Sequence, residues 1–179
     1  MAKRTPAIRY NNIMIDLETL GLTADSVILS IGAVKFNPTG AICDEAFYTV
    51  VDIDDQRDRH INGSTLAWWV KQGESAQKVF DAPKKSSLDA ALEDLQAFVD
   101  HAEYSVWSNG ADFDIPMINH ALRTRGYGPL FKHWNHKCFR TLKGLYPNVP
   151  KPPFEGTQHN ALMDAIHQAK WAQALLTAK

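Results

Sequence analysis

Cysteine and long apolar runs are what this chain most lacks. Its 179 residues hold two cysteines, Cys43 and Cys138, and thiols so far apart cannot form the dense disulfide framework of a small secreted protein. No segment approaches the ~20 apolar residues of a membrane span, and residues 1–10 lead into no apolar signal core. We therefore expect a cytoplasmic protein with reduced thiols and no membrane partner.

A net charge of one sign is also missing. The chain has 19 Lys and Arg residues against 20 Asp and Glu residues, so its formal charge is -1 and no global positive field attracts nucleic acid. Any site for a polyanion must be local. Hydrophobic residues make up 45% of the chain and charged residues 22%, a balance typical of a chain that buries a core. We expect one domain over residues 1–179.

Hydrophobic periodicity predicts strands in the first third of the chain. Apolar, β-branched segments at 13–17, 27–36 and 41–51 are typical of strands. The turn at 37–40 joins the last two as antiparallel neighbours, so these three strands form a meander. A further strand is predicted over 104–108.

Helices dominate the rest of the chain. The four prolines of 147–158 predict an irregular surface loop before the last helix. Ser64 is a candidate cap of the first helix. Strands followed by helices that alternate with a late strand predict an α/β fold, a mixed sheet flanked by helices. Helical spacing and end signals place the helices at about 65–72, 88–99, 115–125, 138–146 and 160–178.

Two carboxylates interrupt the first predicted strand. Asp16 and Glu18 are spaced by two, so they project from one face while Ile15 and Leu17 point to the other. Two like charges on a half-buried strand are costly unless a cation compensates for them. Hard oxygen ligands of this kind suit Mg²⁺ or Mn²⁺. The pair therefore indicates a divalent-metal site; the alternative is that the strand ends near Asp16 and both acids are solvated.

Two later segments carry acids where open α/β sheets build their sites. Residues 108–114 leave the late strand and begin a helix, and Asp114 either contributes to a site or caps that helix. His159 precedes Asp164 by five positions at the start of the last helix. Each segment alone is ambiguous, but their combination is not.

Together the three segments resemble the exonuclease motifs of the DEDDh family, the DnaQ-like branch of the ribonuclease H-like superfamily. The matching residues are Asp16 to Thr19, then 109–114 ending in Phe-Asp, then His159 followed after four residues by Asp164, in the order of that family. Trp68-Trp69 after the third strand is similar to the short phage-type and mycobacterial-type (Rv2179c-like) 3′-to-5′ exonucleases. The resemblance covers most of the chain and implies a ribonuclease H-like fold.

The resemblance also implies a site for two ions, Mg²⁺ or Mn²⁺. Asp16 would bridge both ions, Glu18 and Asp164 would complete the ligands of the first, and Asp114 would hold the second through water. His159 would be the general base.

The chemistry explains these residue types on its own terms. Phosphodiester hydrolysis needs an activated water, a stabilised leaving oxygen and relief of accumulating negative charge, and two divalent ions about 3.5–4 Å apart meet all three needs. An imidazole in that setting contributes about 10²–10⁴ in rate. Asp112 is an extra acid that the family pattern lacks. We choose Asp114 over it because Asp114 follows Phe113 and begins the helix.

Substrate contacts are expected around the motifs. The resemblance suggests that the residues after Glu18 meet the 3′-terminal nucleotide, although Gly21 alone would indicate only a turn. Aromatic side chains near the site can stack bases at roughly 1–3 kcal/mol each, and core packing is the alternative for both Trp68 and Trp69. The predicted contacts are Thr19, Leu20, Gly21, Asn109, Phe113 and Trp68.

Charge is distributed unevenly along the chain. Residues 115–154 contain no Asp or Glu. Such a block beside a metal centre suits a groove that tracks phosphates, and a solvated basic face is the alternative. A zinc site at His133, His136 and Cys138 is disfavoured because a fourth ligand with suitable spacing is missing. The cations of the block are Arg123, Arg125, Lys132, Lys137, Arg140, Lys143 and Lys151.

The sequence thus predicts a metal-dependent 3′-to-5′ exonuclease that releases nucleoside 5′-monophosphates from single-stranded DNA or RNA. One alternative is a catalytically idle nucleic-acid-binding module with the same fold. Another is an exoribonuclease that trims RNA rather than DNA, since contacts to the 2′-hydroxyl cannot be read from composition. A homodimer that completes the groove between subunits stays open.

Overall fold

A five-stranded mixed sheet forms the centre of the computed structural model, which describes residues 10–100 and 103–178. The strand order is β3-β2-β1-β4-β5. β1 to β3 form the predicted antiparallel meander, while β4 and β5 run parallel to β1. The predicted α/β class is confirmed. The strands are β1 Asn12–Thr19, β2 Ile28–Phe36, β3 Ile42–Val50, β4 Ser105–Ser108 and β5 His136–Cys138.

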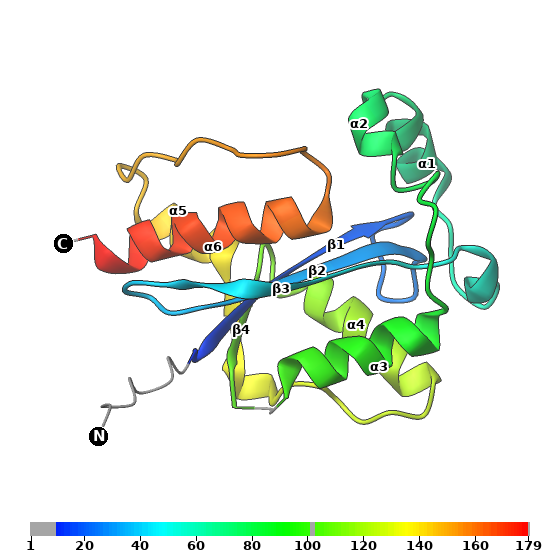
Figure 1. Cartoon of the computed structure of the whole chain (residues 1–179), viewed down its shortest axis with the longest axis horizontal. Helices are drawn as coiled ribbons and strands as arrows, with labels where there is room; N and C mark the ends of the chain where they lie inside the picture. Colours follow the sequence, from blue (N-terminus) through cyan, green and yellow to red (C-terminus); the bar gives the residue numbers. More distant parts are fainter. Residues whose placement is uncertain (1–9, 101–102, 179) are drawn as a thin grey trace, which may run out of the picture.

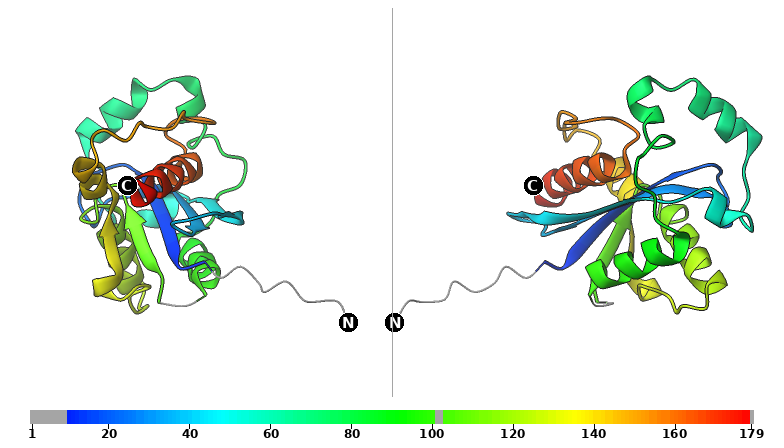
Figure 2. Two further views of the ribbon diagram at one scale, coloured as in Figure 1. Left: turned by 90° about the vertical axis from the view of Figure 1, so that its left-hand side faces the viewer. Right: turned by 45° about the vertical axis from the view of Figure 1, so that its right-hand side comes forward.

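Helices cover both faces of this sheet (Figure 1). α3 (Leu88–Val99) and α4 (Asp114–Thr124) lie on one face. α5 (Phe139–Leu145) and the long α6 (Ala161–Thr177) lie on the other. α1 (Gly63–Val70) and α2 (Glu74–Gln77) stand beyond the carboxyl end of β1, away from both layers (Figure 2). Among the described helices, none is both long and apolar enough to cross a lipid bilayer.

Strand alternation divides the core into two layers. Ile13 and Ile15 of β1 pack against α3 and α4, whereas Met14 faces the alanines of α6 on the other side. Asp16 and Glu18 follow Met14 at steps of two, so they also face α6. Gly32, the β2 partner of Asp16, makes this close approach feasible: a Cβ there would lie 2.2 Å from the backbone of Ala161. The start of α6 therefore rests directly on the sheet beside Asp16.

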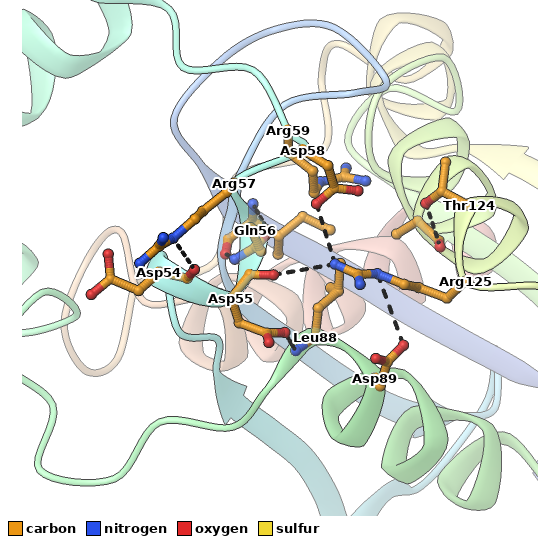
Figure 3. A network of polar contacts seen from close by, with 12 residues as sticks. Asp54, Asp55, Gln56, Arg57, Asp58, Arg59, Leu88, Asp89, Thr124 and Arg125 are labelled. Atoms are coloured by element: carbon orange, nitrogen blue, oxygen red, sulfur yellow. Dashed lines mark hydrogen bonds and ion pairs between the residues drawn. The ribbon is translucent and has the colours of Figure 1, made fainter.

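The segment between β3 and α1 is fixed by buried polar side chains. Gln56 is 1% exposed and pairs with both backbone groups of Ile28, accepting from its N–H at 2.9 Å and donating to its carbonyl at 2.8 Å. Arg59 donates to the carbonyl of Ser26 at 2.9 Å. These bonds hold the chain that leads into α1 against β2. Arg125, which caps the carboxyl end of α4, joins this segment by donating to the Asp55 backbone carbonyl and by pairing with the carboxylates of Asp58 and Asp89 (Figure 3).

Two sequence-based expectations need correction. The helix over 138–146 begins only at Phe139, because His136–Cys138 pairs in parallel with β4 as a fifth strand. The cap of α1 is Asn62 rather than Ser64, since the side-chain oxygen Asn62 Oδ1 accepts from the N–H groups of Ser64 and Thr65. Cys138 has a free thiol, and the side chain of Cys43 lies outside the described residues.

Candidate active site

Three carboxylates converge at the carboxyl end of β1. One oxygen from each of Asp16, Glu18 and Asp164 lies within 4.8 Å of the other two. The two β1 acids share a face because strand side chains alternate, and Asp164 comes from the first turn of α6. The predicted convergence of the first and third motifs is thus present in the structure.

Asp114 reaches the same place from the other side of the sheet. It is the first residue of α4, is 2% exposed, and accepts a hydrogen bond from the Leu17 N–H at 3.1 Å. This bond places it next to Asp16 in the sequence of β1, and its charge raises the pKa of Asp16. Asp112, by contrast, is exposed. The geometry therefore supports Asp114 as the carboxylate of the second motif.

Crowding of these acids makes their ionisation unfavourable. Burial raises the pKa of Asp16 well above its usual range, and the charges of Asp114, Glu18 and Asp164 raise it further. Burial, then Asp164 and Asp114, raises the pKa of Glu18 to about 8. Burial raises the pKa of Asp114 to about 7. A divalent cation would reverse these shifts, since it favours the charged form of every ligand.

The acids fit such a cation in their hydrogen bonding as well. The Asp164 Oδ2 atom is buried and, in the part of the chain that the structure describes, accepts no hydrogen bond. Gln168, one turn after Asp164 on α6, donates from Nε2 to Asp16 Oδ1 at 2.7 Å and so orients that carboxylate. Sequence analysis did not select Gln168, although its spacing of four from Asp164 places both on one helix face. An oriented carboxylate beside an unsatisfied one suits a metal better than a solvated acidic surface.

Without metal, the protein should lose stability as the pH rises. Because the folded state holds protons on Glu18 and Asp114 that the unfolded chain releases, these two groups lower the free energy of unfolding between about pH 3.8 and pH 8 and add no pH dependence below that window. We expect the Tm in EDTA to drop by at least about 5 °C from pH 5 to pH 8, since each kcal/mol moves Tm by about 2–4 °C in a domain of this size. Scanning calorimetry at several pH values measures this change.

Two controls accompany that measurement. Millimolar Mg²⁺ at pH 8 should restore the Tm, because the cation stabilises the ionised acids. Glu18→Gln should flatten the metal-free pH profile, because the substituted amide does not titrate. A metal-free Tm that rises from pH 5 to pH 8 would contradict the raised pKa values.

A cleft of about 420 Å³ adjoins the carboxylates. It lies between the end of β1 and α1, next to the first residues of α4. One wall is charged at Glu18, and the rest is largely apolar, which suits a nucleoside placed with its phosphate at the acids. The lining residues are Leu17, Glu18, Thr19, Leu22, Ser64, Thr65, Trp68, Trp69 and Phe113.

The expected contacts after the first motif are only partly placed in this cleft. Thr19 lines it, but Leu20 is 2% exposed in the core, and its backbone groups are already bonded to Val27 and Asn62. Leu20 is therefore not available to a nucleotide. Leu22 is 71% exposed and lines the cleft instead. Its position in the sequence, an apolar residue directly after Gly21 in a loop, could have indicated this role.

Gly21 and Asn109 also lie beside the cleft rather than in its wall. A Cβ on Gly21 would meet the Ser26 hydroxyl at 2.4 Å, so this glycine permits a tight turn. The Asn109 carbonyl accepts a hydrogen bond from Arg140 Nη2 at 2.7 Å. Both residues shape the backbone near the carboxylates.

The two tryptophans have different roles in the structure. Trp69 is 2% exposed and donates from its indole nitrogen to the Thr19 carbonyl at 2.9 Å, which ties α1 to the end of β1. Trp68 is 42% exposed and faces the cleft. His159 packs edge-on against the Trp68 ring, with the ring centroids 4.9 Å apart. Trp69 is thus a core residue, and Trp68 is available to a substrate.

His159 lies close to the acids through the backbone that precedes α6. Its φ of 60° is left-handed, an uncommon conformation for a residue other than glycine. The next residue, Asn160, caps α6 by accepting from the Met163 N–H at 3.1 Å. Burial raises the pKa of Asp164, and the nearby imidazole and backbone of His159 oppose this rise.

Comparison with solved structures identifies the fold. Escherichia coli exonuclease I in complex with a dA16 oligonucleotide matches 94% of this chain and 41% of its own, with 12% identity and a TM-score of 0.70. The nuclease domain of 3′hExo, a DEDDh family member bound to rAMP, matches 93% of this chain and 92% of its own chain, with 15% identity and a TM-score of 0.60. Cell-death related nuclease 4 matches 93% of this chain and 64% of its own chain, with 13% identity and a TM-score of 0.54. The chain spans less than half of exonuclease I.

Comparison by sequence identifies the family. No curated protein matches the sequence. The model of the Rv2179c-like 3′-5′ exoribonuclease domain matches residues 11–176, which is nearly the whole chain. The resemblance to the DEDDh exonucleases is confirmed, and the chain belongs to the Rv2179c-like 3′-5′ exoribonuclease domain family, on a ribonuclease H-like fold.

Proposed function

We propose that this domain removes nucleoside 5′-monophosphates from the 3′ end of single-stranded RNA, with Mg²⁺ or Mn²⁺ in a two-ion site. The observation that carries the proposal is the convergence of Asp16, Glu18 and Asp164 beside the cleft, with Asp114 bonded to the Leu17 N–H next to Asp16. The family's description as exoribonucleases supports RNA as the substrate. The relative solved with rAMP and the one solved with a single-stranded oligonucleotide support a mononucleotide product and a single-stranded substrate.

The residues divide the work of hydrolysis among them. Asp16, Glu18 and Asp164 would hold one ion, and Asp16 with Asp114 the other. Bound divalent ions lower the pKa of water and neutralise charge on the phosphate. His159 would accept the proton of the attacking water, because its imidazole lies between α1 and the start of α6, close to the motif that carries Asp164. Gln168 keeps the Asp16 carboxylate in a fixed orientation through its 2.7 Å hydrogen bond.

The cleft supplies the preference for an end. Trp69, whose indole bonds to the Thr19 carbonyl, and Thr19 itself line one side of the cleft, and we expect the terminal nucleoside to stop there. Trp68 and Phe113 offer aromatic faces for the terminal base, a contact worth about 1–3 kcal/mol in single-strand binding. The scissile phosphate then lies at the carboxylates.

Digestion of labelled oligonucleotides tests this function directly. Single-stranded RNA and DNA of one sequence, labelled at the 5′ end, are incubated with the protein and Mg²⁺, Mn²⁺ or EDTA. A ladder that shortens from the 3′ end, faster on RNA and stopped by EDTA, is the expected result. Equal rates on DNA would overturn the sugar preference alone. Binding without shortening would favour the idle nucleic-acid-binding module.

The loop at 147–158 should become ordered when nucleic acid binds. It is irregular, as its prolines predict, and it leads directly to His159. Two contacts connect it to α6: the rings of Phe154 and His167, whose centroids are 4.9 Å apart, and the ion pair between Glu155 and Lys170. We expect hydrogen exchange in this loop to slow severalfold with a hydrolysis-resistant phosphorothioate RNA, whereas α3 exchanges as before. Unchanged exchange in the loop would contradict its role as a mobile support of His159.

A further inference from the structure

Three cations lie together on α5 and the loop that follows it: Arg140, Lys143 and Lys151. We call them the α5 cationic cluster. The lysines come to one place because both cover the indole of Trp171 on α6, with Nζ atoms 5.2 Å and 5.8 Å from the ring centroid. Lys143 also lies 4.8 Å over the Phe139 ring. The cluster thus lies where α5 and the loop that follows it meet Trp171 of α6.

The cluster extends from the second motif to α6. Arg140 is in the first turn of α5 and donates to the Asn109 carbonyl at 2.7 Å. Lys143 follows it on the same helix, and Lys151 shares the Trp171 ring with Lys143. Positive charge therefore runs from the segment that carries Asp114 to Trp171 on α6.

This positive charge is not balanced within the protein. Over residues 10–100 and 103–178, none of the three cations forms an ion pair with a carboxylate, and the whole block 115–154 contains no acid. Burial lowers the pKa of Lys143, and repulsion by Arg140 and Lys151 lowers it further. The Trp171 indole N–H, which can only donate, is buried and lacks an acceptor among the described residues. Unpaired cations and an unused donor together indicate an anionic ligand with acceptor oxygens.

The position of the cluster relative to the cleft indicates which anion. The cleft for the terminal nucleoside is lined by residues of α1 and of the end of β1. α1 stands beyond the amino end of α6, whereas α5 lies alongside α6 (Figure 1). A strand whose 3′ nucleoside fills the cleft has only its 5′ portion to extend past the carboxylates. We propose that the α5 cationic cluster binds the backbone phosphates of the nucleotides on the 5′ side of the scissile bond. This inference rests on the proposed function, and it makes the enzyme prefer longer strands over dinucleotides.

Chain-length dependence tests the cluster separately from catalysis. The double variant Lys143→Gln/Lys151→Gln is compared with wild type and with Lys85→Gln, which changes an exposed lysine before α3. The readout is the ratio of kcat/KM for a 12-nucleotide RNA to kcat/KM for a dinucleotide of the same 3′ sequence. We expect the double variant to lower this ratio about tenfold. The association constant for RNA should also depend less on salt: the magnitude of the slope of its logarithm against log salt concentration should fall by about 1.4, since each phosphate contact contributes about 0.7 with single strands. Lys85→Gln should change neither quantity.

Further measurements separate the two proposals and control for folding. Lys143→Arg/Lys151→Arg keeps both charges and should retain the wild-type ratio of kcat/KM for the 12-nucleotide RNA to kcat/KM for the dinucleotide. A tenfold lower ratio in this variant would overturn a role based on charge. An unchanged ratio and salt slope in the Gln variant would also overturn it. If wild type hydrolyses neither substrate, the proposed function fails. Anisotropy with a labelled phosphorothioate 12-mer then decides the cluster alone: weaker binding by the Gln variant supports it, and equal binding rejects it.

Discussion

Asp16→Asn should lower the rate of RNA shortening by at least about 10³-fold, because loss of a ligand shared by two ions costs several kcal/mol and each 1.36 kcal/mol is a factor of ten. The same variant should be more stable than wild type in EDTA at pH 8. Asparagine keeps the oxygen that accepts from Gln168 while it removes one of the charges that Glu18, Asp114 and Asp164 repel. Single-turnover digestion of a 5′-labelled RNA and a thermal melt measure the two effects.

A lower activity together with a higher metal-free stability would exclude loss of the fold as the cause of the lower activity. A variant that had lost its fold would lose both activity and stability, whereas loss of a metal ligand lowers activity and raises metal-free stability. Asp112→Asn is the matched control, because Asp112 is an exposed acid two positions before Asp114. It should digest RNA at the wild-type rate. An Asp16→Asn variant that shortens RNA as fast as Asp112→Asn would refute the carboxylate site.

The convergence of the acids could be predicted because it depends on a local rule. Side chains alternate along a strand, so the spacing of Asp16 and Glu18 places both on the face of β1 that α6 covers. The approach of α6 depends on Gly32, which is a property of the neighbouring strand and of the antiparallel register. Sequence alone shows the glycine but not what lies against it. The third-motif acid could therefore be named from the family pattern, while its contact with β1 needed coordinates.

Features that depend on long-range packing were missed or misplaced. β5 is three residues long and exists because β4 offers a free edge, so local propensity favoured the helix that follows it. Asn62 and Ser64 are both good capping residues, and the choice between them depends on the path of the chain fixed by Gln56 and Arg59. The position of Leu22 rather than Leu20 in the cleft also depends on the path of the chain. The turn at Gly21 directs the Leu20 side chain into the core and the Leu22 side chain into the cleft.

The position of His159 depends on both tryptophans of α1. Trp69 fixes α1 to the end of β1 through its bond to the Thr19 carbonyl. Trp68 then presents its ring to the imidazole at a centroid distance of 4.9 Å, nearly perpendicular at 89°. The left-handed backbone at His159 turns the chain so that the imidazole lies over α1 while Asn160 caps α6. The His159 imidazole is therefore held between two helices that are far apart in the sequence.

His159→Ala should lower kcat about 10²–10⁴-fold with little change in KM for RNA, because a general base acts on the chemical step and not on binding. Trp68→Leu should have a smaller effect, about 2- to 10-fold, since an aromatic edge contact is worth about 0.5–1.5 kcal/mol and the acids stay in place. His133→Ala, at an exposed position on the short turn before β5, is the matched control and should behave as wild type. Steady-state digestion of one RNA by the three variants separates the roles. If His159→Ala raised KM and left kcat unchanged, the imidazole would be a substrate contact, and the proton of the attacking water would have to go to another group.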